Sequence, residues 1–262
     1  MTLFKQDMES SESAPGVFTV TISNNWSING NPNGGYLMAL IVSSVIARTG
    51  KVMTPVVTAN YISRSVPGPA QILVEDISLT KQFHRFEARL VQNGREKVRA
   101  LATFALENAE CTINRYEAAA VPLPPRESCV PLPSTPGYTL FDQLDVLLDP
   151  ACAGWMKNQL VDRSANRGWI RFKNGRAYDL ASLFLIADSM PPAVMATHGI
   201  LAWVPTIELS VNIRNLTCSP WLNCSLRTRF ITCGLLEADG EVWDEAGNLV
   251  AISRQIGQVK KL

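Results

Sequence analysis

The sequence predicts an α+β protein built from two copies of one unit, in which a long apolar helix precedes four strands. The same order of elements, a strand, a helix and four strands, occurs on each side of a proline-rich stretch at residues 118–137. Matching residues also recur at a nearly constant spacing of 148 to 153 positions. These pairs are Thr58 and Thr206, Gly50 and Gly199, and Gly94 and Gly247.

The first unit opens with alternating apolar and polar residues at 17–22, which predict a strand. A passage of Asn, Gly and Pro at 29–35 then leads into an apolar helix at about 34–47. β-Branched and aromatic residues, interrupted by Pro-Gly-Pro and Asn-Gly, indicate four strands after the helix. These strands are predicted at 56–66, 71–81, 83–92 and 96–106.

The second unit repeats this order after a longer lead-in that starts at Tyr138. It has a strand at 168–173, a helix at about 179–190, and strands at 203–214, 221–233, 235–244 and 249–259. The half-apolar strands are typical of an antiparallel sheet with one covered face, wrapped around the helix of its unit. This arrangement is the hotdog fold, and two fused copies make a double hotdog.

The proline-rich stretch sets the expected domain boundaries. Repeated proline removes backbone donors and favours an extended, solvated chain. We therefore expect an N-terminal hotdog at 1–117, a linker at 118–137 and a C-terminal hotdog at 138–262.

Composition and charge argue against several classes of protein. The 24 basic and 23 acidic residues give a net charge of +1 without a long basic run, which argues against nucleic-acid binding. The apolar run at 36–47 is too short for a membrane span. The polar first residues lack the features of a secretory signal, so we expect an intracellular, cytoplasmic protein.

The usual catalytic and metal-binding motifs are missing from the sequence. Its six cysteines form no C-x-x-C pair and there are only two histidines, so we expect reduced thiols and no metal or redox cofactor. No G-x-S-x-G elbow, Walker loop or G-x-G-x-x-G occurs.

Three polar residues of the second half carry a family resemblance. Asp188 lies in Ala-Asp-Ser within the apolar helix, Thr206 opens Thr-Ile-Glu-Leu-Ser, and Gln255 lies near the end of the last strand. In this pattern the chain resembles acyl-CoA thioesterase II proteins, from residue 17 to 259. The resemblance implies that these three residues hold one water, and that Asp188 takes its proton as the water attacks a thioester. No covalent intermediate is then required.

Each of the three residues also has a structural interpretation. Asp188 could be a solvated or helix-capping carboxylate, although an ionised group in an apolar helix is costly without partners. Thr206 could be an ordinary strand residue and Gln255 an edge amide facing solvent. Pro191 and Pro192 either only end the helix or also aim the carboxylate into a cleft.

The start of the first helix offers a second candidate feature, in the sequence Asn33-Gly34-Gly35-Tyr36. Its free N–H groups, aided by the helix dipole, could stabilise the oxyanion that forms on the thioester carbonyl. Alternatively, these residues only form a turn. Many hotdog thioesterases carry His-Gly-Gly here, so Asn33 replaces a titrating group with an amide.

The remaining aromatic and basic residues allow two interpretations. The aromatic residues either pack in the core or line an acyl tunnel. They are Trp169, Phe172, Trp203, Trp221 and Trp243. The basic residues Arg64, Lys81 and Arg85 could meet CoA phosphates or be solvated. His84 and His198 lack nearby acidic partners in the sequence and are expected in a loop or at a helix end, not as catalysts.

The sequence therefore predicts hydrolysis of an acyl thioester, carried by CoA or a carrier protein, in lipid or polyketide metabolism. A non-catalytic or repurposed acyl-binding hotdog is the alternative, favoured by Asn33. A hotdog hydratase or dehydratase would call for a paired His and Asp. We also expect a homo-oligomer.

Overall fold

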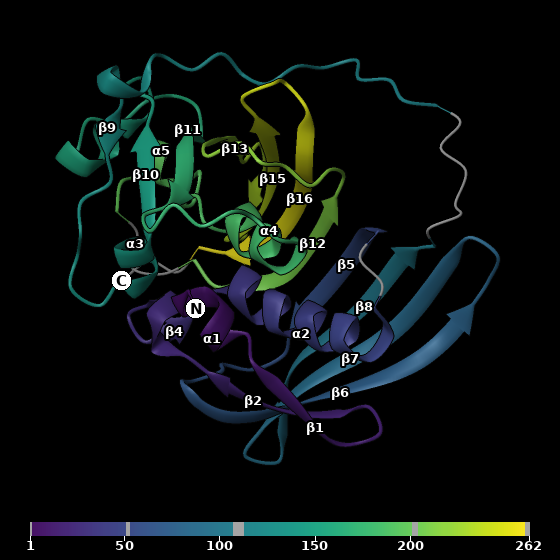
Figure 1. Ribbon diagram of the computed structural model, residues 1–262. Coiled ribbons are helices and arrows are strands. Elements are labelled where there is room, and N and C mark those ends of the chain that lie inside the picture. Colours follow the sequence, from purple (N-terminus) through teal and green to yellow (C-terminus); the bar gives the residue numbers. More distant parts are fainter. Residues whose placement is uncertain (1, 51–52, 107–112, 201–203, 260–262) are drawn as a thin grey trace.

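The computed structural model describes residues 2–50, 53–106, 113–200 and 204–259. Within them, one antiparallel sheet runs through both halves of the chain and curves around two central helices (Figure 1). These helices are α2 (Gly34–Thr49) and α4 (Leu180–Ala187), one from each half. The architecture is the predicted double hotdog.

The elements of the N-terminal half follow the predicted order. Besides α2, they are α1 (Leu3–Asp7), β1 (Ser10–Ala14), β2 (Val17–Ile22), η1 (Asn24–Trp26), β3 (Ser27–Ile28), β4 (Asn31–Pro32), β5 (Met53–Tyr61), β6 (Gly68–Leu79), β7 (Phe83–Gln92) and β8 (Arg95–Ala105).

The C-terminal half repeats this order with additions before its first long strand. Besides α4, its elements are η2 (Arg126–Ser128), β9 (Val130–Pro131), α3 (Thr139–Gln143), β10 (Leu144–Leu148), η3 (Ala153–Lys157), β11 (Ala165–Phe172), α5 (Met195–His198), β12 (Thr206–Ile213), β13 (Leu222–Arg227), β14 (Ile231–Thr232), β15 (Leu235–Asp244) and β16 (Leu249–Gln258).

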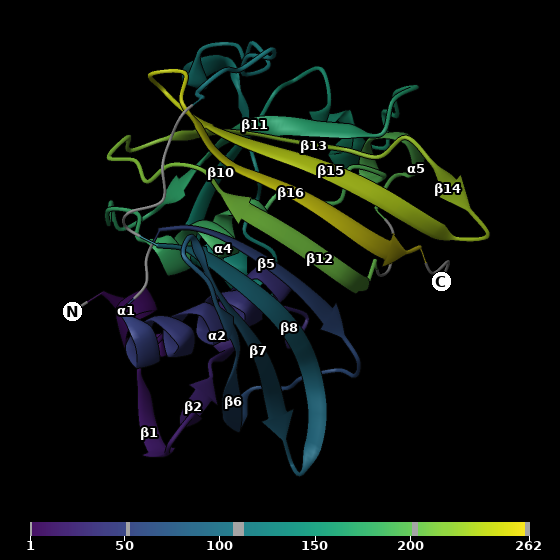
Figure 2. The ribbon, with the colours of Figure 1, turned by 90° about the vertical axis from the view of Figure 1, so that its right-hand side faces the viewer.

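The order of strands in the sheet reveals the duplication. Counted outward from the centre, the order β5, β8, β7, β6, β2, β1 is mirrored by β12, β16, β15, β13, β11, β10. The two halves meet where β5 pairs with β12, and Figure 2 shows these strands side by side. At this central pair Thr58 lies opposite Ser210, and the Thr58 hydroxyl donates to the Ser210 hydroxyl at 2.9 Å.

Helix α2 begins at Gly34 as predicted and ends at Thr49, two residues beyond the predicted end at 47. The Asn33 side chain caps its first turn by accepting a hydrogen bond from the Tyr36 N–H. Gly50, with a left-handed φ of 67°, ends the helix. The residues from 35 to 42 are all buried, which explains why this part of the helix shows no polar face.

Helix α4 ends at Ala187, three residues before the predicted end at 190. A proline ring in a helix clashes with the carbonyl four residues earlier, so Pro191 would collide with the Ala187 carbonyl. Asp188 therefore occupies the C-terminal cap position of α4 instead of lying within the helix.

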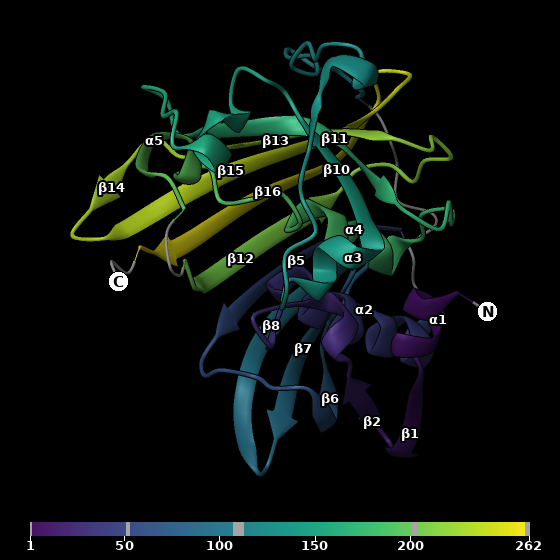
Figure 3. The same cartoon turned by 90° about the vertical axis from the view of Figure 1, so that its left-hand side faces the viewer.

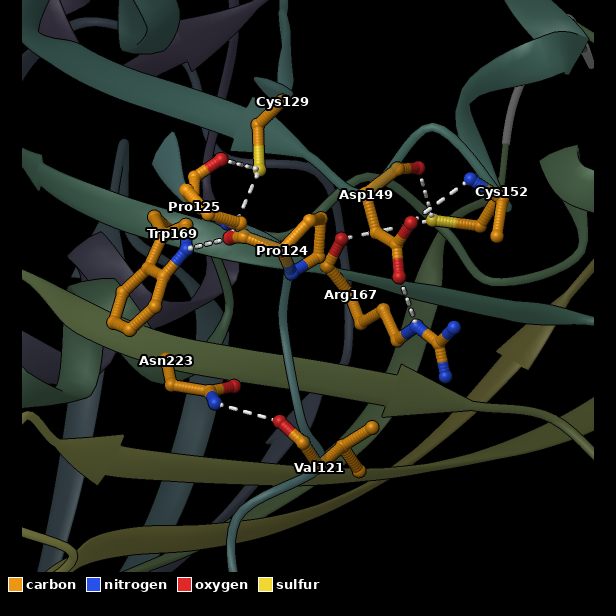
Figure 4. A network of polar contacts seen from close by, with 10 residues as sticks. Val121, Pro124, Pro125, Cys129, Asp149, Cys152, Arg167, Trp169 and Asn223 are labelled. Carbon is orange, nitrogen blue, oxygen red and sulfur yellow. Dashed lines mark hydrogen bonds and ion pairs between the residues drawn. The ribbon is translucent and has the colours of Figure 1, made fainter. Parts of the chain in front are cut away.

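The proline-rich stretch is more closely packed than its composition suggests. Its carbonyl at Val121 accepts a hydrogen bond from Asn223, and its carbonyl at Pro124 accepts one from the Trp169 indole (Figure 4). Trp169 and Asn223 are cross-strand partners in β11 and β13, so neighbouring strands hold the stretch. Its strand β9 also pairs with β10.

After β9 the chain returns to the N-terminal half, where α3 lies beside the start of α2 (Figure 3). The Asn29 N–H donates to the Gly137 carbonyl at 2.7 Å, and the Ser27 N–H donates to the Thr139 hydroxyl at 3.1 Å. The second unit thus covers the helix start of the first.

Two further expectations from the sequence concern the cysteines and membrane-spanning helices. Five cysteines are free thiols, while Cys111 lies outside the described residues. Across the part of the chain that the structure describes, no helix is long and apolar enough to cross a membrane.

Candidate active site

Asp188, Thr206 and Gln255 meet at one point between the two halves. The Gln255 amide Nε2 donates to Asp188 Oδ1 at 3.3 Å and also to the Thr206 hydroxyl. The carboxylate, the hydroxyl and the amide thus share one small volume, as the resemblance implies for groups that hold a water.

A β-bulge brings Thr206 to the same face as Gln255. Thr206 pairs with Gly257 but Glu208 pairs with Ile256, so Ile207 is an extra residue in β12. Because Gly257 and Gln255 are two residues apart in β16, they point to the same face of the sheet. Without the bulge, Thr206 would point to the other face.

The start of helix α2 holds the carboxylate of Asp188 from the opposite half. The Gly35 N–H donates to Asp188 Oδ2 at 2.9 Å, and the Asn33 amide donates to the same oxygen at 3.0 Å. The Asn33 amide also donates to the Asp188 backbone carbonyl at 2.9 Å. Donors and the positive end of a helix dipole stabilise a negative charge here.

Burial raises the pKa of Asp188 from 3.8 to about 6. The Gly35 N–H, the Asn33 amide and the Gly34 N–H act in the opposite direction, because they stabilise the ionised form. The result is a carboxylate that is ionised at neutral pH but far more basic than an ordinary aspartate. This property suits a general base.

The predicted oxyanion donors have other acceptors. The Gly35 N–H is taken by Asp188, and the Tyr36 N–H donates to the Asn33 side-chain oxygen at 2.9 Å. The helix start therefore positions the carboxylate of Asp188, a use that we did not predict from the sequence. Asn33 contributes by holding the carboxylate through hydrogen bonds that do not require a titrating group.

Tyr61, at the end of β5, is a site residue that the sequence analysis missed. Its hydroxyl donates to the Gly34 carbonyl at 2.7 Å. Burial, reinforced by the nearby charge of Asp188, raises the pKa of Tyr61 well above its usual value. Tyr61 therefore remains a neutral hydrogen-bond donor that braces the start of α2.

A cavity of about 960 Å³ runs past these residues. Its lining includes exposed apolar residues, with Ile62 56% and Ile207 41% exposed, and buried ones, with Leu140 at 2% and Trp155 at 7% exposure. Asp188, Thr206 and Gln255 also line it. We call the part of the cavity that Leu140 and Trp155 line the inner end.

Asn166 fixes the turn that follows Asp188, and the sequence analysis missed it too. This fully buried amide donates to the carbonyls of Pro191 and Pro192 at 3.1 and 3.0 Å and accepts from the Trp155 indole at 3.3 Å. Asn166 shares the inward face of β11 with Ile170 and Phe172. A polar residue at an apolar position of the strand pattern was the available signal.

Of the aromatic residues for which the sequence left core packing and an acyl tunnel open, none of those that the structure describes lines the cavity. Phe172 packs against Phe4 and Trp26, while Trp169 binds the proline-rich stretch. Trp221 stacks with Arg171, and Trp243 packs against Tyr116. Trp203 lies outside the described residues. The aromatic residues that line the cavity are Tyr61, Tyr138, Phe141 and Trp155.

Neither of the two histidines lines this cavity. His198 ends α5, as predicted. His84 lies on strand β7, so the prediction of a loop or helix-end position is wrong for it, and its Nε2 is 2.7 Å from Asp76 Oδ1. The partner was missed because β6 and β7 form a hairpin that folds Asp76 back beside His84.

Comparison with protein families settles what kind of protein carries this site. A sequence model of the acyl-CoA thioesterase N-terminal domain matches residues 22–105, and one of the C-terminal domain matches residues 126–259. The chain belongs to the acyl-CoA thioesterase family. Thioester hydrolysis is therefore its general chemistry, and an acyl-CoA is the substrate that the family implies.

Solved structures show the same fold for this thioesterase. A candidate thioesterase II from Thermobifida fusca has 24% identity and a TM-score of 0.89, over 100% of this chain and 98% of that chain. A hot dog protein from Alicyclobacillus acidocaldarius has 18% identity and a TM-score of 0.89, over 100% and 99%. An acyl-CoA thioesterase II from Mycobacterium marinum has 16% identity and a TM-score of 0.78, over 99% and 98%. Comparison with curated protein sequences found no match.

Proposed function

We propose that this thioesterase hydrolyses acyl thioesters by direct attack of a water held by Asp188, Thr206 and Gln255. The observation that carries the proposal is the meeting of these three groups on the wall of a deep, partly apolar cavity. A carboxylate with a raised pKa supplies the base, and the hydroxyl and amide orient the water.

The reaction needs no other nucleophile. The water oxygen bonds to the thioester carbon as its proton passes to Asp188, and the carbonyl oxygen takes up the negative charge. When the carbonyl reforms, the carbon–sulfur bond breaks and the thiolate leaves. The protonated Asp188 can then return the proton to the sulfur, giving a free acid and a free thiol.

The inner end of the cavity suits the acyl group. Its walls include Leu140 and Trp155 together with three flexible methionines, Met156, Met190 and Met195. Methionine side chains are flexible, so this end of the cavity can adapt to apolar acyl chains of different shapes. Much of this end belongs to the second half's added segment, the longer lead-in that follows the proline-rich stretch.

The geometry also bears on the two alternatives. Asn33 motivated a non-catalytic binding protein, yet it donates two hydrogen bonds to Asp188 and so supports a functional carboxylate. A hydratase or dehydratase would call for histidine at the site, and neither His84 nor His198 lines the cavity.

The pH dependence of thiol release tests the proposal. Because protonation inactivates a general base, kcat/KM for an acyl-CoA should fall as the pH drops through the pKa of Asp188, about 6. The decline should approach about tenfold per pH unit below that point. A constant rate down to about pH 4, the ordinary pKa of aspartate, would contradict the role of Asp188. Absence of thiol release from every acyl-CoA tried would contradict the activity.

A further inference from the structure

Tyr61 reaches the start of helix α2 from the centre of the sheet. It is the last residue of β5, which lies between β8 and β12 at the junction of the two halves (Figure 2). Val57 and Ala59, four and two residues earlier, are fully buried, so Tyr61 follows them on the inner face of the strand. Pairing with strands on both sides fixes β5, and with it the place of the Tyr61 side chain.

The Tyr61 hydroxyl and the Asp188 carboxylate bind opposite sides of one peptide group. The hydroxyl donates to the Gly34 carbonyl at 2.7 Å, and the Gly35 N–H donates to Asp188 Oδ2 at 2.9 Å. This carbonyl and this N–H belong to the same planar, trans peptide unit, so they point in opposite directions. Tyr61, the peptide group and Asp188 therefore form one continuous chain of two hydrogen bonds.

Glycine at position 34 lets both partners approach the peptide group. A methyl group on Gly34 would lie 3.0 Å from both the Tyr61 hydroxyl and Asp188 Oδ2, so a larger residue would crowd them. The hydroxyl has a single proton, which Tyr61 gives to the Gly34 carbonyl. Tyr61 can therefore act on Asp188 through the peptide group and not through a hydrogen bond of its own.

Hydrogen bonds in such a chain strengthen one another. When a hydroxyl donates to an amide carbonyl, electron density shifts toward the carbonyl oxygen, and the N–H of the same amide becomes a stronger donor. Here the strengthened donor is the Gly35 N–H, which stabilises the ionised form of Asp188 against the effect of burial. Loss of the Tyr61 hydroxyl should therefore weaken the grip of Gly35 on the carboxylate.

Few titratable groups face Asp188 from the surrounding elements. Among the described residues that line the cavity, the other titratable side chains are Tyr61, the solvent-exposed Arg64, and Tyr138. The elements packed around the carboxylate, α2, α4, β12, β15 and β16, contribute no titratable side chain to the described lining. The ionisation of Asp188 is thus governed by its burial and by the donors at the start of α2.

We propose that Tyr61 is a positioning residue for the reaction, which strengthens the hydrogen bond from the Gly35 N–H to Asp188 by donating to the peptide group between them. Its effect on turnover rests on the proposed function, whereas its effect on the carboxylate does not. The N-terminal half then controls the carboxylate of the C-terminal half in two steps, from β5 to the start of α2 and from there to Asp188.

Tyr61→Phe removes the hydroxyl and keeps the ring. We expect the pKa of Asp188 to rise from about 6 by about 0.3–0.5 pH unit, because the ionised form loses part of its stabilisation. NMR titration of ¹³C-labelled aspartate carboxyl groups measures this shift, and Asp188→Asn identifies the signal. The Gly35 amide proton should also move upfield, because its hydrogen bond weakens. Tyr138→Phe, the matched control, removes a hydroxyl from the same cavity lining and should move neither signal.

Thiol release gives a second readout. A higher pKa leaves less of Asp188 ionised at low pH, so Tyr61→Phe should lower kcat/KM about two- to threefold more at about pH 5 than at about pH 8. A side chain that only packs would lower both rates equally. Site-specific meta-fluorotyrosine at position 61 is a stronger donor of nearly the same shape, and it should move the pKa of Asp188 in the opposite direction, downward.

The fluorinated variant keeps the proposal testable even where Tyr61→Phe does not fold. Opposite shifts of the Asp188 titration in the two variants support the chain of hydrogen bonds. An unchanged titration of Asp188 and an unchanged Gly35 signal, with equal losses of kcat/KM at both pH values, would overturn it. A raised pKa of Asp188 without a matching shift in the pH profile would support the chain but contradict the proposed function, because Asp188 would then not be the general base.

Discussion

Asp188→Asn is expected to lower kcat for thioester hydrolysis by about 10²- to 10⁴-fold, the usual contribution of a general base. An amide cannot take the proton of the attacking water, so only the positioning of the substrate remains. KM should change little, because Asp188 contacts the water in our account and not the acyl chain or the thiol arm.

The same substitution should leave the protein folded and at least as stable. Asparagine can still accept from the Gly35 N–H, and the Gln255 amide can turn its oxygen toward the new NH₂ group. In the parent protein the pKa of Asp188 is about 6 in the fold and near 3.8 when unfolded. The ionised form is therefore disfavoured by folding, a cost that grows as pH rises from about 4 to 6 and amounts to about 3 kcal/mol at neutral pH.

Thermal unfolding and thiol release at neutral pH together check this prediction. Asp162→Asn is the matched control, because Asp162 is exposed and away from the cavity lining. We expect it to change neither quantity. Parent-like turnover by Asp188→Asn would refute the role of Asp188, and a large loss of stability would refute the account of its pKa.

Gly35→Ala should disrupt both the fold and the site. A methyl group at this position would lie 2.4 Å from the Phe184 carbonyl oxygen and 2.8 Å from Asp188 Cβ. Neither neighbour is the flexible end of a side chain, so α2 and α4 must separate. We expect a loss of about 1–3 kcal/mol in the free energy of unfolding, as for other overpacked interiors. Activity should fall at least about tenfold, because the Gly35 N–H then moves away from Asp188.

Gly34→Ala separates these two effects. Its methyl group would lie 3.0 Å from both Asp188 Oδ2 and the Tyr61 hydroxyl, which are ends of side chains that can shift. Stability should therefore fall less than in Gly35→Ala, while turnover still declines. Ser43→Ala, elsewhere on α2, controls for the alanine itself. Denaturant unfolding with equal stability for Gly35→Ala and Ser43→Ala would contradict the close helix contact.

The fold could be predicted from the sequence because the patterns that indicate it are either local or repeated in both halves. The apolar run of α2 and the alternating residues of β2 mark their elements directly, and the recurrence of the pattern marks the duplication. The short strand β10, the counterpart of β1 in the first unit, and the helix α3 were missed because each has only five residues and so gives a weak local pattern. The docking of the proline-rich stretch depends on Trp169 and Asn223, which come far later in the sequence.

The site was only partly predictable for the same reason. Asp188 stood out as a charge in an apolar helix, but the resemblance supplied the roles of Thr206 and Gln255. The bulge at Ile207 and the partners of Gly35 arise from contacts between distant segments. Local patterns could not show that the helix start of one half holds the carboxylate of the other.

A single turnover in ¹⁸O-labelled water, with the protein in excess over an acyl-CoA, tests direct water attack most directly. The account predicts that the first acid released carries one solvent oxygen, and that mass spectrometry of the quenched protein finds neither an acyl adduct nor label in Asp188. An acyl group bound to Asp188, or label in its carboxyl group with an unlabelled acid, would contradict it.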